Sequence, residues 1–346
     1  MNAPPAPPRQ TRWLVSPRYD GLFFIGGALV TLLFLGLYHL ADAYEVGPRG
    51  DAIILTYFVY TAIFDHPHIF QTFSRTHLDK ESFARHRLAH TWGLGGFIVA
   101  GFVLGAMGLE GELIIFAAFY GTWHIIRQHW GFIKIYKGLN ADFRPVDDHL
   151  DGAFFYLGML ALTVHDYVDE EAPSTVYGTL KVQFPSVPSS VADGLMLLFG
   201  VATCLFVARQ IWRLWRGVGV NWPKLALMGA AIGTHGVVFW LTATPFLVAE
   251  ALETAYHNVQ YQGFVMHWQR RRFPRQAMAV RWGSLALVYG IVVGVIEVTA
   301  LMNRSWSLVF TPFAMIVLWH YYIDGKIWRT REDPRLKSLL TSSPTR

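Results

Sequence analysis

The feature that most constrains this chain is a series of apolar runs, each about twenty residues long. The first run reads GLFFIGGALVTLLFLGLYHLAD and contains no Lys, Arg or Glu. A helix rises about 1.5 Å per residue and the bilayer hydrocarbon is about 30 Å thick, so about twenty apolar residues are enough to cross it. Hydrophobic residues make up 53% of the chain and charged residues 15%. The sequence therefore predicts an all-α fold, a polytopic bundle of transmembrane helices.

Ten such segments can be drawn, joined mostly by short loops. The predicted spans are about 21–42, 51–76, 88–108, 112–136, 149–168, 191–215, 223–244, 246–269, 281–302 and 306–328. We expect one helical domain over 21–328, between a Pro-rich tail over 1–20 and a second tail over 329–346. The longest outer connection, 169–190, is predicted to be a loop, with an interfacial flap as the alternative.

The orientation follows from the distribution of Lys and Arg, which cytoplasmic loops collect. Basic residues occupy both tails and the loops after spans 2, 4, 6 and 8, whereas the opposite side has only Arg49, Lys181 and Arg304. Both termini are therefore predicted to be cytoplasmic, in a multi-pass protein of the cell's inner (plasma) membrane. Because the positive charge lies at membrane edges, and no dinucleotide-binding or P-loop glycine motif occurs, we predict no nucleic-acid or nucleotide partner.

Four histidines stand out among the fourteen in the chain. They lie in the motifs HPHIFQT, WHIIRQHWG, ETAYHNVQYQG and WHYYIDGK, on spans that all run from the outer to the cytoplasmic side. His68, His124, His257 and His320 come about 17, 12, 11 and 14 residues after the outer ends of their spans, so they share a depth. Ionisable residues inside spans usually face the bundle interior or a functional site.

This residue set favours a metal centre. Neutral imidazole is the commonest metal ligand, and Cys204, the single cysteine, excludes a site built from several thiolates. Histidines with a carboxylate fit non-haem iron best. We therefore predict that His68, His124, His257 and His320 hold Fe(II) and are catalytic.

Polar side chains one turn from three of these histidines are predicted to support the centre. Gln128, Glu253 and Asp324 share a helical face with His124, His257 and His320, respectively. Metal-bound histidines usually give their second ring nitrogen to such a partner. These three residues are therefore expected either to orient the ligands or to bind the metal directly.

The stretch FDHPH in span 2 places Asp65, His66 and His68 around Pro67. Proline removes a backbone hydrogen bond and frees the carbonyl near residue 63, which predicts a bend here. His66 and His68 cannot share a face of a straight helix, so His66 is predicted to be either an additional metal ligand or a supporting residue. Asp65 and His129 are further supporting candidates.

These motifs give the chain a resemblance to the bacterial and archaeal membrane β-carotene 15,15'-dioxygenases of the bacteriorhodopsin-related-protein type. The shared features are the pair Pro67-His68, His124 in a later span, YHNVQYQGFVMHWQRRR around His257, and His320 followed closely by Asp324. The resemblance implies an iron centre held by histidines from different helices, with dioxygen as oxidant and a lipophilic polyene as substrate. The chain differs in having Ile69 directly after the first histidine, where that family typically has glycine.

The leading hypothesis is an integral-membrane non-haem-iron oxygenase that acts with O2 on a lipophilic, carotenoid- or lipid-like substrate. One alternative is a membrane cytochrome in which pairs of these histidines ligate haem b. Another is a transporter or proton relay lined by His and carboxylate side chains. Neither the substrate, the oligomeric state nor a redox partner can be inferred from the sequence.

Overall fold

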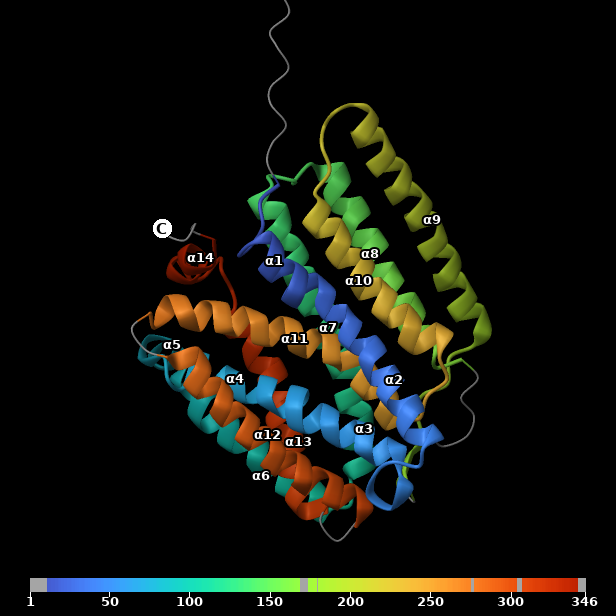
Figure 1. The fold of residues 1–346 in the computed structure, drawn as a ribbon, viewed down its shortest axis with the longest axis vertical. Helices are drawn as coiled ribbons and strands as arrows, with labels where there is room; N and C mark the ends of the chain where they lie inside the picture. Colours follow the sequence, from blue (N-terminus) through green and yellow to red (C-terminus); the bar gives the residue numbers. More distant parts are fainter. Residues whose placement is uncertain (1–10, 169–173, 179, 275–276, 304–306, 342–346) are drawn as a thin grey trace, which may run out of the picture.

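The computed structural model describes residues 11–168, 174–178, 180–274, 277–303 and 307–341 (Figure 1). The rest of the two predicted tails, and part of the 169–190 connection, lie outside the described residues. The longer helices are α2 (Leu29–Ala43), α3 (Ala52–Tyr60), α4 (His66–Thr76), α6 (Leu94–Ala106), α7 (Glu110–Leu139), α8 (Pro145–His165), α9 (Ser189–Trp215), α10 (Trp222–Gly236), α11 (Phe246–Arg272), α12 (Met278–Met302) and α13 (Ser307–Ile327).

Shorter elements join these helices or cap the bundle. They are α1 (Pro17–Asp20), α5 (Lys80–Arg85), α14 (Pro334–Thr341), the π-helical segments Gly21–Ile25, Thr61–Asp65, Ala89–Gly93 and Val237–Leu241, and the 3-10 turns Gly26–Ala28 and Pro48–Gly50. The predicted all-α class is confirmed, and each predicted span coincides with a helical segment. The outer connection also contains a hairpin of β1 (Ser174–Tyr177) and β2 (Leu180–Val182), where the sequence predicts a loop.

The helices are those of a membrane protein in length and composition. Within the described part of the chain, five are long and apolar enough to cross a bilayer: Pro17–Ala43, Ala89–Ala106, Ser189–Trp215, Trp222–Leu241 and Met278–Met302. The other predicted spans also form helices, but they contain more polar residues, including the candidate site.

The surface of the bundle is apolar and its interior is partly polar. Leu197, Val201 and Leu205 on α9 are exposed, as are Val288 and Val295 on α12, whereas buried positions include many hydrogen-bonding side chains. Apolar surface on this scale is unfavourable in water and suits contact with lipid tails. This distribution supports the assignment to the membrane class.

Helix α11 runs through the middle of the bundle (Figure 1) and is buried along most of its length. It packs against α2, α3, α4, α7, α10 and α12, while α13 pairs with α6, and α9 covers α8. Helix α12 packs so closely on the start of α4 that a Cβ atom added at Gly290 would lie 2.6 Å from the Pro67 ring. The two helices that carry His68 and His257 are thus fixed by packing on several sides.

Span 2 is interrupted just before Pro67, where the sequence predicts a bend. The π-helical segment Thr61–Asp65 separates α3 from α4, and Pro67 lies in the first turn of α4. Single π turns inside helices frequently occur at functional sites. The interruption sets the rotation of α4, and therefore the directions in which His66 and His68 point.

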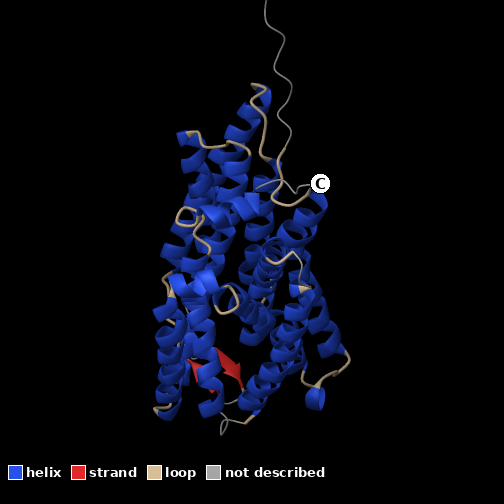
Figure 2. Ribbon diagram, turned by 90° about the vertical axis from the view of Figure 1, so that its left-hand side faces the viewer, coloured by secondary structure: helices blue, strands red, loops and turns tan. Residues whose placement is uncertain are grey.

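The described parts of both tails fold onto one end of the bundle, opposite the hairpin (Figure 2). The buried Asp20 accepts hydrogen bonds from the backbone N–H groups of Leu14 and Val15 and from the Tyr136 hydroxyl. On the C-terminal side, Leu336 and Leu340 of α14 are buried. At the opposite end, Val176 and Val182 of the hairpin are buried in the core.

A buried ionic cluster connects α7, α8, α9 and α10 at the end where α7 finishes. Lys224 Nζ donates to Asp142 and Asp151 at 2.9 Å, and Arg213 donates to Asp142 at 2.7 Å. Burial alone would raise the pKa of Asp142, but Lys224 and Arg213 outweigh it and hold that pKa at about 2. This cluster stabilises the fold at the bundle end and has its own partners in place.

Candidate metal centre

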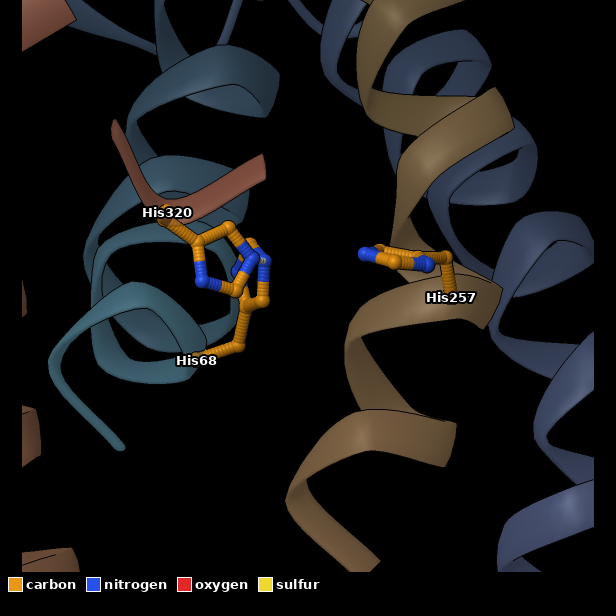
Figure 3. Close-up of side chains that lie close together, drawn as sticks. All are labelled: His68, His257 and His320. Carbon is orange, nitrogen blue, oxygen red and sulfur yellow. Dashed lines mark hydrogen bonds between the residues drawn. The ribbon is translucent and has the colours of Figure 1, made fainter. Parts of the chain in front are cut away.

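Four histidines from four helices converge in the interior. The ligand atoms of His68 (α4), His257 (α11) and His320 (α13) lie within 4.8 Å of one another. Figure 3 shows the rings of His68 and His320 close together, with His257 facing them from α11. His124 (α7) adds a fourth ring, with its centroid 4.9 Å from that of His257 and 5.2 Å from that of His320. The common depth predicted from the sequence therefore corresponds to proximity in space.

The spacing between two of these rings fits ligands of one ion. The Nε2 atoms of His68 and His320 are 3.1 Å apart. With metal–nitrogen bonds of about 2.1 Å, two neighbouring ligand atoms lie about 3.0 Å apart around an octahedral ion and about 3.4 Å apart around a tetrahedral one. The pair is therefore spaced for a shared metal without a change in backbone position.

The orientation of His68 is fixed by Asp65. His68 Nδ1 lies 2.5 Å from the Asp65 carbonyl oxygen and 3.4 Å from its carboxylate. A carbonyl oxygen only accepts, so Nδ1 carries the proton and Nε2 presents its lone pair to the cluster. Asp65, predicted to be a supporting residue, thus contacts the ring of His68.

The orientation of His320 depends on a buried network of hydroxyl groups and a carboxylate. Thr72 Oγ1 is 2.7 Å from His320 Nδ1 and 2.7 Å from the Tyr261 hydroxyl, which donates to Asp324 Oδ1 at 3.0 Å. Asp324 Oδ1 is itself 3.7 Å from His320 Nδ1. Asp324 thus supports His320 mainly through Thr72 and Tyr261, which leaves His320 Nε2 free to face His68.

Several ring nitrogens in the cluster lack a hydrogen-bond partner. Considering the described residues, neither nitrogen of His257 has one, and neither does Nε2 of His124. A buried polar atom left unpaired costs about 1–3 kcal/mol, so such atoms are uncommon and require an explanation. A metal ion bound among the four rings would supply the missing partner, and an all-imidazole donor set fits Fe(II) or Zn(II).

Gln128 contacts the backbone beside the cluster. Its Nε2 donates to the His257 carbonyl oxygen at 3.0 Å and lies 3.4 Å from Gln260 Oε1. Gln128 therefore links α7 to α11 and positions His257 through its backbone. The ring of His124 is instead stacked on Tyr321, with centroids 4.6 Å apart.

Three other predicted site residues point elsewhere. His66 Nε2 is 2.8 Å from Glu297 on α12, which also accepts from the Tyr57 hydroxyl at 3.2 Å. The expectation that His66 joins the ligands therefore does not match its geometry, because its ring faces α12. Glu253 lies 3.6 Å from His235, and the ring of His129 packs against Tyr256.

Thr72 and Tyr261 were not predicted to support the metal ligands, although a sequence signal for that role was present. Thr72 follows His68 by four positions and Tyr261 follows His257 by four, the spacing that connects Gln128 to His124 and Asp324 to His320. Residues four apart share a helical face. All four histidines therefore have a polar neighbour one turn further along, and this shared spacing would have identified both residues.

Searches with protein-family models, among curated proteins and among solved structures gave no match to this chain.

Proposed function

We propose that this protein is an integral-membrane non-haem-iron oxygenase that acts with O2 on a lipophilic substrate. The observation that carries the proposal is the convergence of four buried imidazoles from four helices, with ring nitrogens of His124 and His257 left unpaired. The residues that would hold the ion are His68, His124, His257 and His320. Fe(II) bound there would supply dioxygen activation.

The compact arrangement supports a single non-haem ion over haem. The two axial ligands of a haem iron lie on opposite faces of the macrocycle. Their ligating nitrogen atoms are therefore separated by twice the usual metal–nitrogen bond length, which is about 4 Å. His68 and His320 Nε2 are 3.1 Å apart, and the other two rings lie close to the same pair.

The rest of the site would orient the ligands and exclude water. The Asp65 carbonyl holds His68, while Thr72, Tyr261 and Asp324 hold His320. The burial of these side chains would keep bulk water from the centre and so limit side reactions.

The surroundings support a lipophilic substrate. The centre lies among helices whose outer surfaces are apolar, which suits a substrate dissolved in the lipid phase. The order of the histidine motifs, which resembles that of the membrane β-carotene dioxygenases, supports a carotenoid- or lipid-like molecule. We propose ten spans with both termini cytoplasmic in the inner (plasma) membrane. The position of α1 and α14 toward the same end of the bundle (Figure 1) supports this.

Metal content and spectroscopy test the proposal. Protein purified in detergent should contain stoichiometric iron without a Soret band, and His320→Ala and His124→Ala should each lower the iron content. His39→Ala is the control, because His39 is exposed on α2, a helix that carries none of the four histidines. A Soret band would favour the haem b alternative. Transport of protons in liposomes by metal-free protein would favour the relay, and iron unchanged in both variants would refute the centre.

Substrate tests follow for the iron-loaded protein. Oxygen uptake should rise when a carotenoid or an unsaturated lipid is added in mixed micelles, and His320→Ala should abolish the increase while His39→Ala retains it. Uptake that does not depend on His320 would argue against oxygenase activity at this site.

A further inference from the structure

An arginine on the outer face of α7 lies deep within a predicted span. Arg127 is exposed, and it comes nine positions before the cytoplasmic end of the predicted span 112–136. At a rise of about 1.5 Å per residue, Arg127 lies about 14 Å inside the cytoplasmic edge of the hydrocarbon. A charged side chain at such a depth is costly, and it usually has a partner of opposite charge or marks a functional site.

Contacts on α7 and α8 hold the Arg127 guanidinium within the predicted span. Its Nη1 donates to the Tyr156 hydroxyl on α8 at 2.7 Å. Tyr156 comes seven positions after the cytoplasmic start of the predicted span 149–168, so it also lies about 10 Å inside the hydrocarbon edge. The guanidinium carbon is 5.9 Å from the centre of the Trp123 ring, which is within cation–π range. The charge is therefore fixed between α7 and α8.

Among the described residues, no carboxylate neutralises this charge. Arg127 forms no ion pair there, and a neutral hydroxyl is its one hydrogen-bond partner. Nearby cations differ in this respect: Lys134, further along α7, pairs with Asp148 at 2.7 Å, and Arg209 of α9 pairs with Asp147 at 2.6 Å. Because a guanidinium has five N–H donors, most of those on Arg127 are left for an anion.

An exposed aromatic surface extends from the guanidinium along α7. Trp123, Phe119 and Phe116 come four, eight and eleven positions before Arg127, which places them on one side of the helix. They are 46%, 39% and 58% exposed. The surface thus has one cation at its cytoplasmic end and aromatic rings toward the predicted outer side. This combination suits a molecule with an anionic head and an apolar chain.

We propose that this face binds a long-chain carboxylate such as a fatty acid, with the carboxylate on Arg127 and Tyr156 and the chain along the aromatic rings. The planar guanidinium matches the two oxygens of a carboxylate, and each charge neutralises the other where either alone is costly. The depth favours a single-chain acid over a phospholipid, because phospholipid headgroups lie outside the hydrocarbon.

The binding face lies close to the four-histidine centre. Arg127 comes three positions after His124 on α7, which is less than one helical turn. The binding face depends on the predicted position of the span and on its own contacts, and it does not require the proposed oxygenase activity.

Photo-labelling with a matched pair of probes tests the proposal. The full-length protein in phosphatidylcholine nanodiscs is titrated with a long-chain fatty acid that carries a diazirine, and separately with the neutral methyl ester of that acid. Labelling by the acid should saturate and map to α7 or α8. The ester should bind about 10–100-fold more weakly, because it cannot form hydrogen bonds between a carboxylate and the guanidinium.

Variants of the arginine provide the second readout. Arg127→Gln should weaken binding of the acid by about 10–100-fold and leave binding of the ester unchanged, and Arg127→Lys should recover part of the affinity. Arg216→Gln is the matched control and should bind the acid like wild type. Arg216 is also exposed, and its guanidinium carbon is also 5.9 Å from a tryptophan ring, that of Trp215 at the end of α9.

Two results would overturn the proposal. One is equal affinity of wild type and Arg127→Gln for the acid. The other is displacement of the acid by phosphatidylglycerol as effectively as by unlabelled fatty acid, because the face would then recognise phospholipid headgroups.

The same experiments separate this proposal from the oxygenase. His320→Ala should lose iron and keep wild-type affinity for the acid. Wild-type protein that lacks iron but shows labelling dependent on Arg127 would refute the oxygenase and leave the binding face standing. Bound iron together with labelling that does not depend on Arg127 would give the reverse conclusion.

Discussion

Replacing Thr72 by valine tests how the structure orients His320. Thr72 is fully buried, and its hydroxyl lies 2.7 Å from both His320 Nδ1 and the Tyr261 hydroxyl. Valine has nearly the same shape and lacks the oxygen, so the packing is preserved. His320 Nδ1 loses its hydrogen-bond partner, and the Tyr261 hydroxyl keeps Asp324 but loses Thr72. Loss of such supporting contacts typically weakens metal binding by about 10–100-fold. This corresponds to about 1.4–2.7 kcal/mol, within the range for one or two unsatisfied buried groups.

The assay is a competition titration of metal-free protein with Fe(II) or Co(II) against a chelator of known affinity, in detergent and without oxygen. Thr72→Val should bind metal about 10–100-fold more weakly than wild type, and Thr72→Ser should restore most of the affinity because it returns the hydroxyl. Thr163→Val is the matched control, since the buried Thr163 hydroxyl donates only to the Met159 carbonyl on its own helix. Wild-type affinity in Thr72→Val, measured alongside loss of binding in His320→Ala, would refute the assigned role of this network.

Two further predictions concern stability. Gly290→Ala should destabilise the protein by about 1–3 kcal/mol, because the new methyl group would lie 2.6 Å from the Pro67 ring. The control is Gly95→Ala, whose added methyl group meets no atom within 4 Å. In thermal unfolding in detergent, Gly290→Ala should show the lower Tm of the two variants. Lys224 holds the pKa of Asp142 at about 2, against the effect of burial. The ionised Asp142 side chain therefore stabilises the folded state by about 2 kcal/mol above its unfolded pKa near 4, and this stabilisation is lost as the pH falls to 2. Asp142→Asn should reduce this part of the acid-induced loss of stability, and an identical acid profile in the variant would contradict the assignment.

The positions of the helices could be predicted from the sequence to within a few residues. The predicted spans 191–215 and 281–302 correspond to α9 and α12, Ser189–Trp215 and Met278–Met302. Apolar length and polar loop residues are local properties, and they suffice to place a helix. The hairpin of β1 and β2 is not predicted from the sequence, because it depends on burying Val176 and Val182 against helices that are distant in the chain.

The candidate site was predictable in part. Depth along each span identified His68, His124, His257 and His320, and the four-residue spacing correctly associated Asp324 with His320. The same spacing predicted that Glu253 supports His257, whereas in the structure the Glu253 carboxylate lies beside His235 on another helix. A residue one turn away shares a face with its neighbour, but that face can be wide enough to contact two different helices.

The all-α class, the approximate bounds of the helices and the common depth of four histidines follow from the order of the amino acids, because they depend on hydrophobic length and on position along a helix. The rotation of each helix about its axis depends instead on how the helices pack. The π-helical segment before α4 and the close packing of Gly290 on Pro67 direct His68 into the cluster and His66 toward Glu297. Helix rotation is set by contacts between segments far apart in the chain, such as Thr72 with Tyr261, and local sequence patterns do not contain that information.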